Sequence, residues 1–480
     1  MTRVSQEVRP RVDFGMFSME KDFFSDKKIL VMGLGRFGGG LDAARFGHEA
    51  GAAVTVTDMA TADDLRDSVN QLEALQGVQL VLGRHEHSDF AAADIVIVNP
   101  AVPPDSPYIK TARDHGAKIT SQIAIFFELC PVPIIGITGA NGKSTTTALT
   151  AHLLHSILER EPETVDYRDV RLGGNIGNHP LLTTLGQIEP DDLVVLELSS
   201  FQLEQLAEIE QAPHVALLTN LTPNHLDRHG TFEAYRAAKE NIFKWQQPRD
   251  GRPAISIFNA EDPVAVEFYH AYRTDSARIS ICFGTTDVPD TFRRAFALPG
   301  PANISNLAAA LAIVRRFGLS DAQILAALPS FKGLPHRLEL VGEFAGVRWY
   351  NDSIATTGPS TIAALDAFGC PIVLIAGGYD KKLPFDELGR VIARKAKAAV
   401  LIGQTAAKIA AAIEAGRDST QAAPTVRTAA SLAEAVDTAR QLAEAGDAVV
   451  LSPACASYDM FTNFQHRGDQ FSRLARDRAP

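Results

Sequence analysis

The sequence lacks several features that define other classes of protein. No apolar run reaches the roughly 18 residues needed to span a bilayer, and charged residues occupy the N-terminal stretch where a signal peptide would be apolar. The four cysteines, Cys130, Cys282, Cys370 and Cys455, form no C-x-x-C pair. This spacing is typical of free thiols in a reducing compartment, and we expect each to be a small core residue. The sequence therefore predicts a cytoplasmic protein with no membrane partner.

Clusters of lysine and arginine are also missing, and the formal net charge is −11. This balance does not favour a nucleic-acid partner, so we expect small-molecule partners. The chain has 480 residues, of which 46% are hydrophobic and 21% charged, as in an ordinary globular protein. Because single cores stop growing at roughly 250–300 residues, we expect two or three domains.

The most informative stretch is an apolar run, Ile134–Thr138, followed by a glycine-containing turn and a Lys-Ser pair. The order Thr138-Gly139-Ala140-Asn141-Gly142-Lys143-Ser144-Thr145 predicts a strand end, a phosphate-binding loop and a helix start. In such a loop the backbone N–H groups face phosphate oxygens, Lys143 supplies positive charge, and Ser144 offers a hydroxyl to Mg²⁺. The spacing is shorter than the general motif, because Ile137 stands at the position of the first glycine. We predict binding of ATP or GTP.

A second glycine motif lies nearer the N-terminus. Gly33, Gly35 and Gly38 fit the pattern G-x-G-x-x-G between an expected strand and an expected helix, and Asp58 ends the next expected strand. An acidic residue roughly 20 positions after the glycines contacts ribose in dinucleotide folds, so NAD(P) is one interpretation. The same turn and helix also hold the pyrophosphate of a UDP-sugar, and the motif by itself leaves both open.

Apolar runs that end in polar residues continue along the chain, separated by helical stretches. They cover residues 28–33, 53–58, 78–82, 93–99, 118–120, 134–138, 192–200, 214–220, 347–352, 371–378, 398–403 and 448–452. Such runs predict α/β folds with parallel sheets, whose carboxyl ends bind ligands. We predict three Rossmann-like domains, over residues 1–123, 124–333 and 334–480, the central one a P-loop-type ATPase domain with a mainly parallel sheet.

Two residues near strand ends of the central domain are candidate metal ligands. Glu197 and His225 lie at or just beyond the ends of two apolar runs, where an oxygen and an imidazole ligand would complete a magnesium shell with Ser144. Each alone has an ordinary structural interpretation: Glu197 as a capping or paired surface carboxylate, and His225 as a core or turn histidine.

Further candidates lie on expected helices. A single helix over residues 227–244 places Tyr235 and Lys239 one turn apart, with Lys239 solvated by default. Asn303 and Asn306 lie near the start of another helix, where they serve as caps or read an adenine edge.

Together these segments resemble the Mur ligases of bacterial cell-wall synthesis, and within them the members that add glutamate. The resemblance is carried, in the family's order, by residues 138–146, 174–177, 196–203, 235–239, 334–337, 351–353 and 451–457. It implies an ATP-dependent acid–amino-acid ligase of peptidoglycan precursor synthesis. Such an enzyme joins glutamate to UDP-N-acetylmuramoyl-L-alanine through an acyl phosphate.

The resemblance also implies that the N-terminal domain binds the UDP moiety and uses no nicotinamide. The residues expected at the UDP-linked substrate are Gly35, Arg36, Phe37, Gly38, Asp58 and Asn175. Met59 and Ala60 match the family poorly, so the contacts to the uracil base stay open.

For ATP and magnesium, the resemblance implies a longer set of residues. ATP contacts are expected from Thr138, Gly139, Ala140, Asn141, Gly142, Lys143, Ser144, Thr145, Asn303, Asn306, Arg337 and Asp352. Two magnesium sites are expected from Ser144, Glu197, His225 and Lys239, the last as a carbamate, and the catalytic residues are Lys143, Glu197, His225 and Lys239. Carbamylation needs a neutral amine, which a partly desolvated site favours.

The glutamate site is implied at Thr356, Lys381, Ser457 and Phe464. One departure from the family is Ile354, which stands where the D-glutamate ligases have a lysine, although Lys382 lies nearby to compensate. We expect D-glutamate, with L-glutamate as the open alternative and an NAD(P)-dependent oxidoreductase as a distant one. Closure of the C-terminal domain is expected to exclude water, and the protein is expected to act as a monomer.

Overall fold

The structure is a computed structural model that describes residues 24–35, 38–103, 105–176, 180–381, 383–417 and 423–477. By its internal contacts the chain divides into two compact units. The first comprises residues 1–141, 166–258 and 262–282, and the second comprises residues 142–165, 259–261 and 283–480. No described helix is long and apolar enough to cross a membrane.

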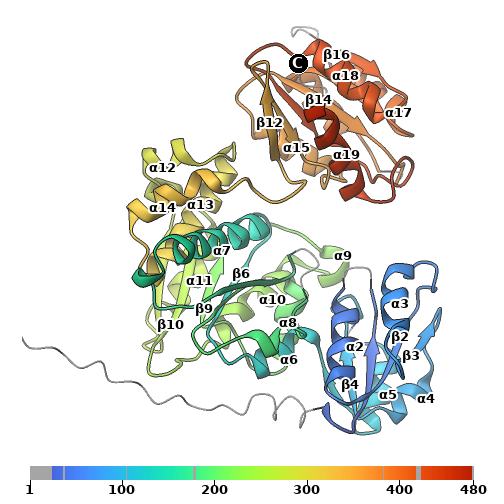
Figure 1. The fold of residues 1–480 in the computed structure, drawn as a ribbon, viewed down its shortest axis with the longest axis vertical. Helices are drawn as coiled ribbons and strands as arrows, with labels where there is room; N and C mark the ends of the chain where they lie inside the picture. The colour runs from blue at the N-terminus through green and yellow to red at the C-terminus, as the bar shows by residue number, and fades with distance from the viewer. Residues whose placement is uncertain are drawn as a thin grey trace, which may run out of the picture. The chain divides into compact units, whose positions relative to one another are not determined.

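The first unit contains a five-stranded sheet with strand order β3-β2-β1-β4-β5, in which every adjacent pair is parallel (Figure 1). Strands and helices alternate along the chain as β1 Lys28–Met32, α2 Gly39–Glu49, β2 Ala53–Asp58, α3 Arg66–Glu73, β3 Gln79–Leu82, α4 His87–Ala92, β4 Ile95–Val98, α5 Pro107–Asp114, β5 Lys118–Thr120 and α6 Gln122–Leu129. The strand order reverses between β1 and β4. The loops after these two strands therefore form the crevice where such sheets bind ligands.

The helix after the first glycine motif packs unusually close to β1. Gly38 is the N-cap of α2, with φ 81°. At Gly40 an added Cβ would lie 2.4 Å from the carbonyl oxygen of Gly33 and 2.5 Å from that of Leu34. Since real Cβ atoms do not approach backbone oxygens so closely, only glycine at position 40 lets α2 start directly against the loop.

A second sheet has strand order β11-β10-β9-β6-β8-β7, and its pairs from β10 to β7 are parallel. Its elements outside α7 are β6 Ile134–Thr138, β7 Val170–Gly174, β8 Leu193–Glu197, α8 Ser200–Ala207, β9 Val215–Leu218, α9 Leu226–His229, α10 Phe232–Lys244, β10 Ala254–Asn259, α11 Pro263–Tyr272 and β11 Arg278–Phe283, with the 3₁₀ turn Leu185–Gln187. Strands β6, β8 and β9 are buried along their whole length, which explains their continuous apolar sequences.

Helix α6 joins the cores of these two sheets. Its residues Ile123, Ile125 and Phe126 are buried in one hydrophobic cluster that also contains strand residues from both sheets. Such burial on nearly all sides matches its almost wholly apolar sequence. The buried carboxylate of Asp42 on α2 adds a polar connection, because it accepts hydrogen bonds from the N–H groups of Leu181, Leu182 and Thr183.

The single helix expected over residues 227–244 is wrong. The structure has two helices, α9 and α10, separated by Gly230 with φ 77° and by Thr231. The Thr231 side chain accepts a hydrogen bond from the N–H of Ala234, so it caps the second helix. The Gly-Thr pair ends one helix and starts the next.

The second unit contains helices from the middle of the chain and a third sheet. The helices are α7 Lys143–Arg160, α12 Asp290–Ala295, α13 Pro301–Val314 and α14 Asp321–Ala327, with the 3₁₀ turns Pro162–Thr164, Thr285–Asp287, Arg315–Phe317 and Leu328–Ser330. The remaining elements are β12 Glu339–Phe344, β13 Val347–Asn351, α15 Gly358–Asp366, β14 Ile372–Gly377, α16 Asp386–Lys395, β15 Ala396–Ile402, α17 Ala406–Ala415, β16 Thr425–Thr428, α18 Leu432–Leu442, β17 Ala448–Leu451 and α19 Phe464–Asp477.

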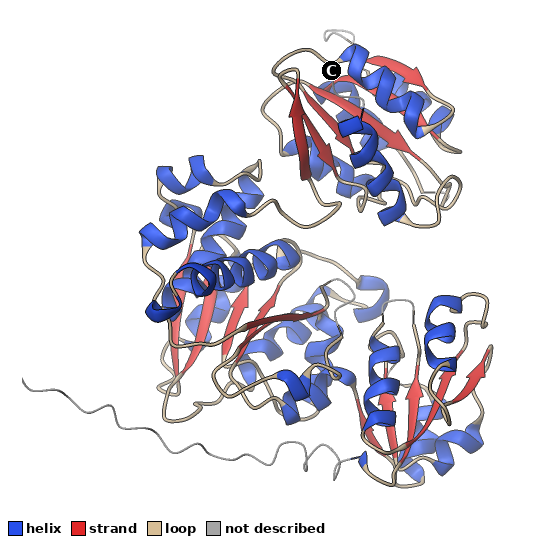
Figure 2. Cartoon of the chain, in the orientation of Figure 1, coloured by secondary structure: helices blue, strands red, loops and turns tan. Residues whose placement is uncertain are grey.

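The third sheet has strand order β12-β13-β17-β14-β15-β16, with β12 antiparallel to β13 and the other pairs parallel. Helices lie along both of its faces (Figure 2). Successive side chains of β14 enter opposite cores: Leu374 packs in the cluster with α16, and Val373 and Ile375 pack in the cluster with α18.

These sheets confirm the predicted fold class, an α/β protein with mostly parallel sheets. Strands β2 and β5 have the predicted bounds. The strands fall into the three expected segments, but the boundaries at residues 123 and 333 stay predictions. Among the cysteines, Cys130 and Cys455 are buried as expected, whereas Cys282 is exposed, so the core prediction is wrong for that residue.

Gly40→Ala should destabilise the first unit strongly, because the new Cβ would meet two backbone oxygens that no side-chain rotation relieves. We expect a loss of about 3 kcal/mol. The matched variant Gly38→Ala has open space around its Cβ and a φ of 81°, so it should cost only about 1 kcal/mol. Thermal unfolding of both variants measures the difference, and equal midpoints would contradict the close helix packing.

Candidate active site

The phosphate loop connects β6 to α7, and its glycines have no room for side chains. At Gly139, with φ 149°, an added Cβ would lie 2.0 Å from the hydroxyl oxygen of Thr219. At Gly142, the N-cap of α7 with φ 83°, an added Cβ would lie 2.2 Å from Oδ1 of Asn306. Lys143 and Ser144 then form the first turn of this 18-residue helix, whose N-terminus favours phosphate. The predicted strand, loop and helix are all present.

Two residues that the sequence analysis did not assign hold the first half of this loop. Asn220 accepts hydrogen bonds from the N–H of Ala140 at its carbonyl, 2.8 Å, and from the N–H of Asn141 at Oδ1, 2.9 Å. Thr219 donates its hydroxyl to the carbonyl of Asn141 at 2.6 Å. The signal in the sequence was a polar pair directly after the apolar run of β9.

The two predicted adenine residues lie on α13, inside the second unit. Asn306 is 7% exposed and donates from Nδ2 to Oδ1 of Asn303 at 3.1 Å, while Asn303 donates to the carbonyl of Pro299 at 2.7 Å. Neither side chain caps α13, whose N-cap is Gly300. The close approach of Asn306 to Gly142 brings this asparagine pair to the phosphate loop.

Glu197, the last residue of β8, is 2% exposed. Its Oε1 accepts a hydrogen bond from Nδ2 of Asn175 at 2.8 Å, whereas its Oε2 has no hydrogen-bond partner among the described residues. A buried carboxylate oxygen in that state is costly unless a cation or water satisfies it. The chemistry of Glu197 therefore fits Mg²⁺, which prefers carboxylate ligands. Asn175, expected at the substrate, instead holds Glu197 in place.

Lys239 on α10 is 1% exposed, so the default interpretation as a solvated lysine is wrong. Its Nζ donates to the hydroxyl of Thr138 at 2.8 Å and lies 5.6 Å from the ring centroid of Tyr235. The Thr138 hydroxyl in turn donates to the carbonyl of Leu198 at 2.5 Å. The structure thus brings Lys239 to the strand end from which the phosphate loop starts.

His225 is exposed and adopts a left-handed conformation with φ 52° at the start of α9. Its ring packs edge-on against Phe201 at 5.4 Å, so it is a turn residue and not a core histidine. In the described part of the chain, no group of three or more His, Cys, Asp and Glu side chains is arranged to hold a metal. The predicted set differs from such a group, because it combines Glu197 and His225 with a hydroxyl and a modified lysine.

At the N-terminal glycine motif, Asp58 stabilises the loop itself. Its Oδ2 accepts from the N–H of Gly35 at 3.1 Å and its Oδ1 from the N–H of Ala60 at 2.8 Å. Asn99, which the sequence analysis left unassigned, follows β4 and donates from Nδ2 to the carbonyl of Gly33 at 3.3 Å. Of the other predicted substrate residues, Arg36 and Phe37 lie outside the described residues.

In the C-terminal sheet, Asp352 is 5% exposed and accepts hydrogen bonds from the Ser452 hydroxyl at 2.7 Å and the N–H of Leu338 at 3.2 Å. Burial raises the pKa of Asp352 to about 7, although the two hydrogen bonds and the charge of Arg337 oppose this rise. Asp352 and Arg337, both predicted at the nucleotide, thus influence each other through charge.

Arg467 links the loops that carry the predicted glutamate residues. It is fully buried, and it donates to the carbonyl and the hydroxyl of Ser353 at 2.8 and 2.9 Å and to the carbonyl of Cys455 at 3.1 Å. Burial lowers its pKa to about 10. Residues 354 and 356 follow the first loop, and Ser457 follows the second.

The predicted glutamate residues themselves differ in exposure. Ser457 is buried, Lys381 is exposed, and the carbonyl of Phe464 accepts the Ser353 hydroxyl at 2.8 Å. Ile354 is half-buried, and its N–H donates to the carbonyl of His336 at 3.1 Å. Lys382, the residue expected to compensate for Ile354, lies outside the described residues.

Comparison with known proteins places this arrangement in a class. Three family models match in succession: the Mur ligase MurD-like N-terminal domain over residues 27–121, the Mur ligase middle domain over 137–297, and the Mur ligase glutamate ligase domain over 336–455. Among solved structures, UDP-N-acetylmuramate-alanine ligase MurC from Thermotoga maritima has a TM-score of 0.55 at 18% identity, covering 94% of this chain and 99% of its own. That likeness shows the fold.

Curated relatives are much more similar in sequence. The UDP-N-acetylmuramoylalanine–D-glutamate ligase of Roseiflexus sp. (strain RS-1) is 42% identical over 93% of this chain and 98% of its own. The enzyme of the same name from Acetivibrio thermocellus is 37% identical over 95% of this chain and 97% of its own. The chain belongs to the Mur ligase family, which confirms the resemblance seen in the sequence.

Asp352 should make stability depend on pH. Its pKa is about 7 in the folded protein against an ordinary value of 3.8, so the folded state favours the protonated form. The stability that this group contributes is present below about pH 4 and is lost as the pH rises towards 7. Relative to Asp352→Asn, the wild type should lose about 2–4 kcal/mol over this window. Thermal unfolding without nucleotide tests this, and parallel pH curves for the two proteins would refute it.

Proposed function

We propose that the protein adds D-glutamate to UDP-N-acetylmuramoyl-L-alanine in the synthesis of peptidoglycan precursors. The observation that carries this proposal is the 42% identity, over nearly the full length of both chains, to a ligase named for this reaction. An oxidoreductase would need a nicotinamide at the N-terminal glycine motif, and that segment matches a MurD-like N-terminal domain. The thiols and the nucleotide substrates suit a reaction in the cytoplasm, carried out by a monomer.

Mur ligases use ATP and Mg²⁺, and this chain has residues that suit both. In our proposal Gly142, Lys143 and Ser144 bind the phosphates at the N-terminus of α7, and the Asn303–Asn306 pair contacts the adenine. The narrow glycine turn supports this assignment, since it leaves backbone N–H groups accessible where a side chain would cover them.

Magnesium ligands in the proposal are Ser144, Glu197, His225 and Lys239 as a carbamate. The orphaned Oε2 of Glu197 supports it, and so does the burial of Lys239, because a buried ammonium is costly and a neutral amine takes up CO₂. Bound magnesium supplies charge neutralisation for the phosphoryl group in transfer.

The chemistry proceeds by transfer of the γ-phosphoryl group of ATP to the carboxylate of the UDP-linked alanine. This step breaks the bond between the γ-phosphorus and its bridging oxygen and gives an acyl phosphate and ADP. The amine of glutamate then attacks the carbonyl carbon, the tetrahedral intermediate expels phosphate, and the ammonium proton is lost to give the amide. Lys143 holds the γ-phosphate, and no protein nucleophile is needed.

Glutamate binds, in this proposal, beside Thr356, Lys381, Ser457 and Phe464. The double link from Arg467 to Ser353 and Cys455 supports the assignment, because it fixes the two loops that carry Thr356 and Ser457. Ile354 removes one charge-assisted contact to a glutamate carboxylate, so Lys381 takes a larger share of that contact.

Phosphate release from ATP should require UDP-N-acetylmuramoyl-L-alanine and D-glutamate together. D- and L-glutamate are compared in separate assays with all other components equal, and we expect turnover with the D isomer at least about tenfold above the L isomer, since the missing contact is worth roughly 1.4 kcal/mol. Release with neither isomer would refute the ligase proposal, and a preference for L-glutamate would reverse its stereochemistry.

Lys239→Ala should lose about 10²–10³-fold in kcat, because the anionic carbamate disappears. Added formate or acetate should restore part of the rate. Lys244→Ala is the matched control, since Lys244 lies on the same helix with an exposed side chain. A ¹³C NMR carbamate signal after incubation with labelled bicarbonate should appear in the wild type and not in Lys239→Ala. An unimpaired Lys239→Ala variant would exclude the role.

A further inference from the structure

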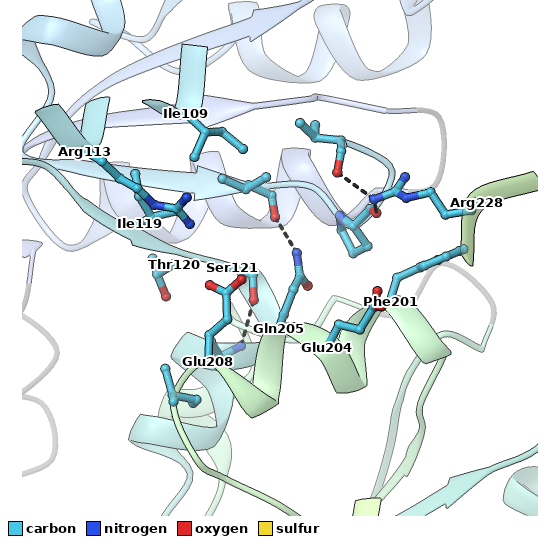
Figure 3. A pocket seen from close by; sticks show the side chains of 15 residues that line it. Ile109, Arg113, Ile119, Thr120, Ser121, Phe201, Glu204, Gln205, Glu208 and Arg228 are labelled. Carbon is cyan, nitrogen blue, oxygen red and sulfur yellow. Dashed lines mark hydrogen bonds between the residues drawn. The ribbon is translucent and has the colours of Figure 1, made fainter. Parts of the chain in front are cut away.

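Arg228 on α9 makes a set of contacts that no part of the predicted chemistry uses. Its guanidinium donates to the carbonyls of three successive residues: to Ala101 at 2.7 Å, to Pro100 at 3.1 Å and to Val102 at 2.7 Å (Figure 3). The acceptors are neutral backbone oxygens arranged to match the planar fork of an arginine. These contacts fix the shape of a loop, because each carbonyl is held in its own direction.

The loop that Arg228 holds lies in the crevice of the N-terminal sheet. It follows β4 and begins at Asn99, whose Oδ1 accepts from the N–H of Ala101 at 3.0 Å and whose Nδ2 donates to the carbonyl of Gly33 at 3.3 Å. Gly33 belongs to the glycine motif after β1. The loop 100–102 is therefore one hydrogen-bonded residue away from the motif that we assign to the UDP-linked substrate.

The other side of Arg228 belongs to the segment of His225. The guanidinium carbon lies 5.0 Å from the ring centroid of Phe201. The same ring stacks on His229 at 5.2 Å and meets the edge of His225 at 5.4 Å. His229 also contacts the hydroxyl of Ser200 through Nε2 at 2.9 Å. Arg228 is thus part of an aromatic cluster that sets where His225 stands.

A cavity of about 70 Å³ separates the two sides beneath this contact. Its lining includes Arg228, Phe201 and Gln205 on one side and Val98 and Arg113 on the other (Figure 3). Across it, Gln205 donates to the carbonyl of Val98 at 3.2 Å. Because the packing is incomplete here, the hydrogen bonds of Arg228 carry a large share of the connection between α9 and the loop.

We propose that Arg228 is a positioning residue that couples the UDP-linked substrate site to the His225 segment. It holds loop 100–102 in the shape that supports the glycine motif, and it holds that loop to the helix that begins at His225. This inference rests on the proposed function, which places the UDP moiety at the glycine motif. A guanidinium is required because a lysine ammonium cannot serve three carbonyls in one plane.

The test compares Arg228→Ala and Arg228→Lys with Arg113→Ala, which lines the same cavity from α5. We expect Arg228→Ala to raise KM for UDP-N-acetylmuramoyl-L-alanine about 10–100-fold, as the loss of hydrogen bonds to a charged donor predicts, with KM for ATP within about twofold of wild type. Arg228→Lys should show the same change at smaller size, and Arg113→Ala should match the wild type. Calorimetric binding of the UDP-linked substrate without ATP should weaken in the same order.

A purely structural role gives other results. Equal increases in both KM values, or a lower unfolding temperature with both KM values unchanged, would overturn the proposal. If Arg228→Ala does not fold, Arg228→Lys decides, and an unchanged KM for the UDP-linked substrate would then refute it. If the wild type itself shows no glutamate-dependent turnover, the proposed function fails, while the calorimetric series still tests Arg228, which requires weaker binding in its variants.

Discussion

The buried hydroxyl of Thr138 is the contact on which the central site depends. It accepts the hydrogen bond of Lys239 and donates to the carbonyl of Leu198, while the carbonyl of Thr138 accepts the N–H of Thr219. Three strand ends and one helix therefore meet at the residue from which the phosphate loop starts. Since a buried hydroxyl has few partners available, a shift of any one element disturbs the others. The loop, Glu197 and Lys239 hold their geometry together.

Guanidinium groups that bind carbonyls recur at the loops of this protein. Arg467 holds Ser353 and Cys455, Arg228 holds residues 100–102, and Arg249 donates to the carbonyls of Val132 and Pro131 just before β6. Loops at strand ends have carbonyls with no partner in the sheet, and the planar fork satisfies several at once. In each case the arginine comes from a distant part of the sequence, so it adds long-range order to a segment with no regular structure.

Much of the fold followed from the sequence, because β6, β8 and β9 are buried on both faces and read as continuous apolar runs. Edge strand β16 was missed, since its residues are half-buried or exposed and leave no such run. For the site, the glycine turn identified the phosphate loop, but Thr219, Asn220 and Arg228 act through neighbours far along the chain, which no local pattern reveals. The burial of Lys239 depends on how α10 packs, so the sequence alone left that lysine with its ordinary solvated state.

The crowding at Gly142 has a consequence for how this protein can change over time. A side chain at position 142 would occupy the space of the Asn306 amide, which itself donates to Asn303. Substitution of the glycine alone would therefore displace an asparagine pair in another helix, and truncation of Asn306 alone would leave a void beside the phosphate loop. Positions 142, 303 and 306 form one evolutionary unit, and descendants of this chain should replace them jointly or keep all of them.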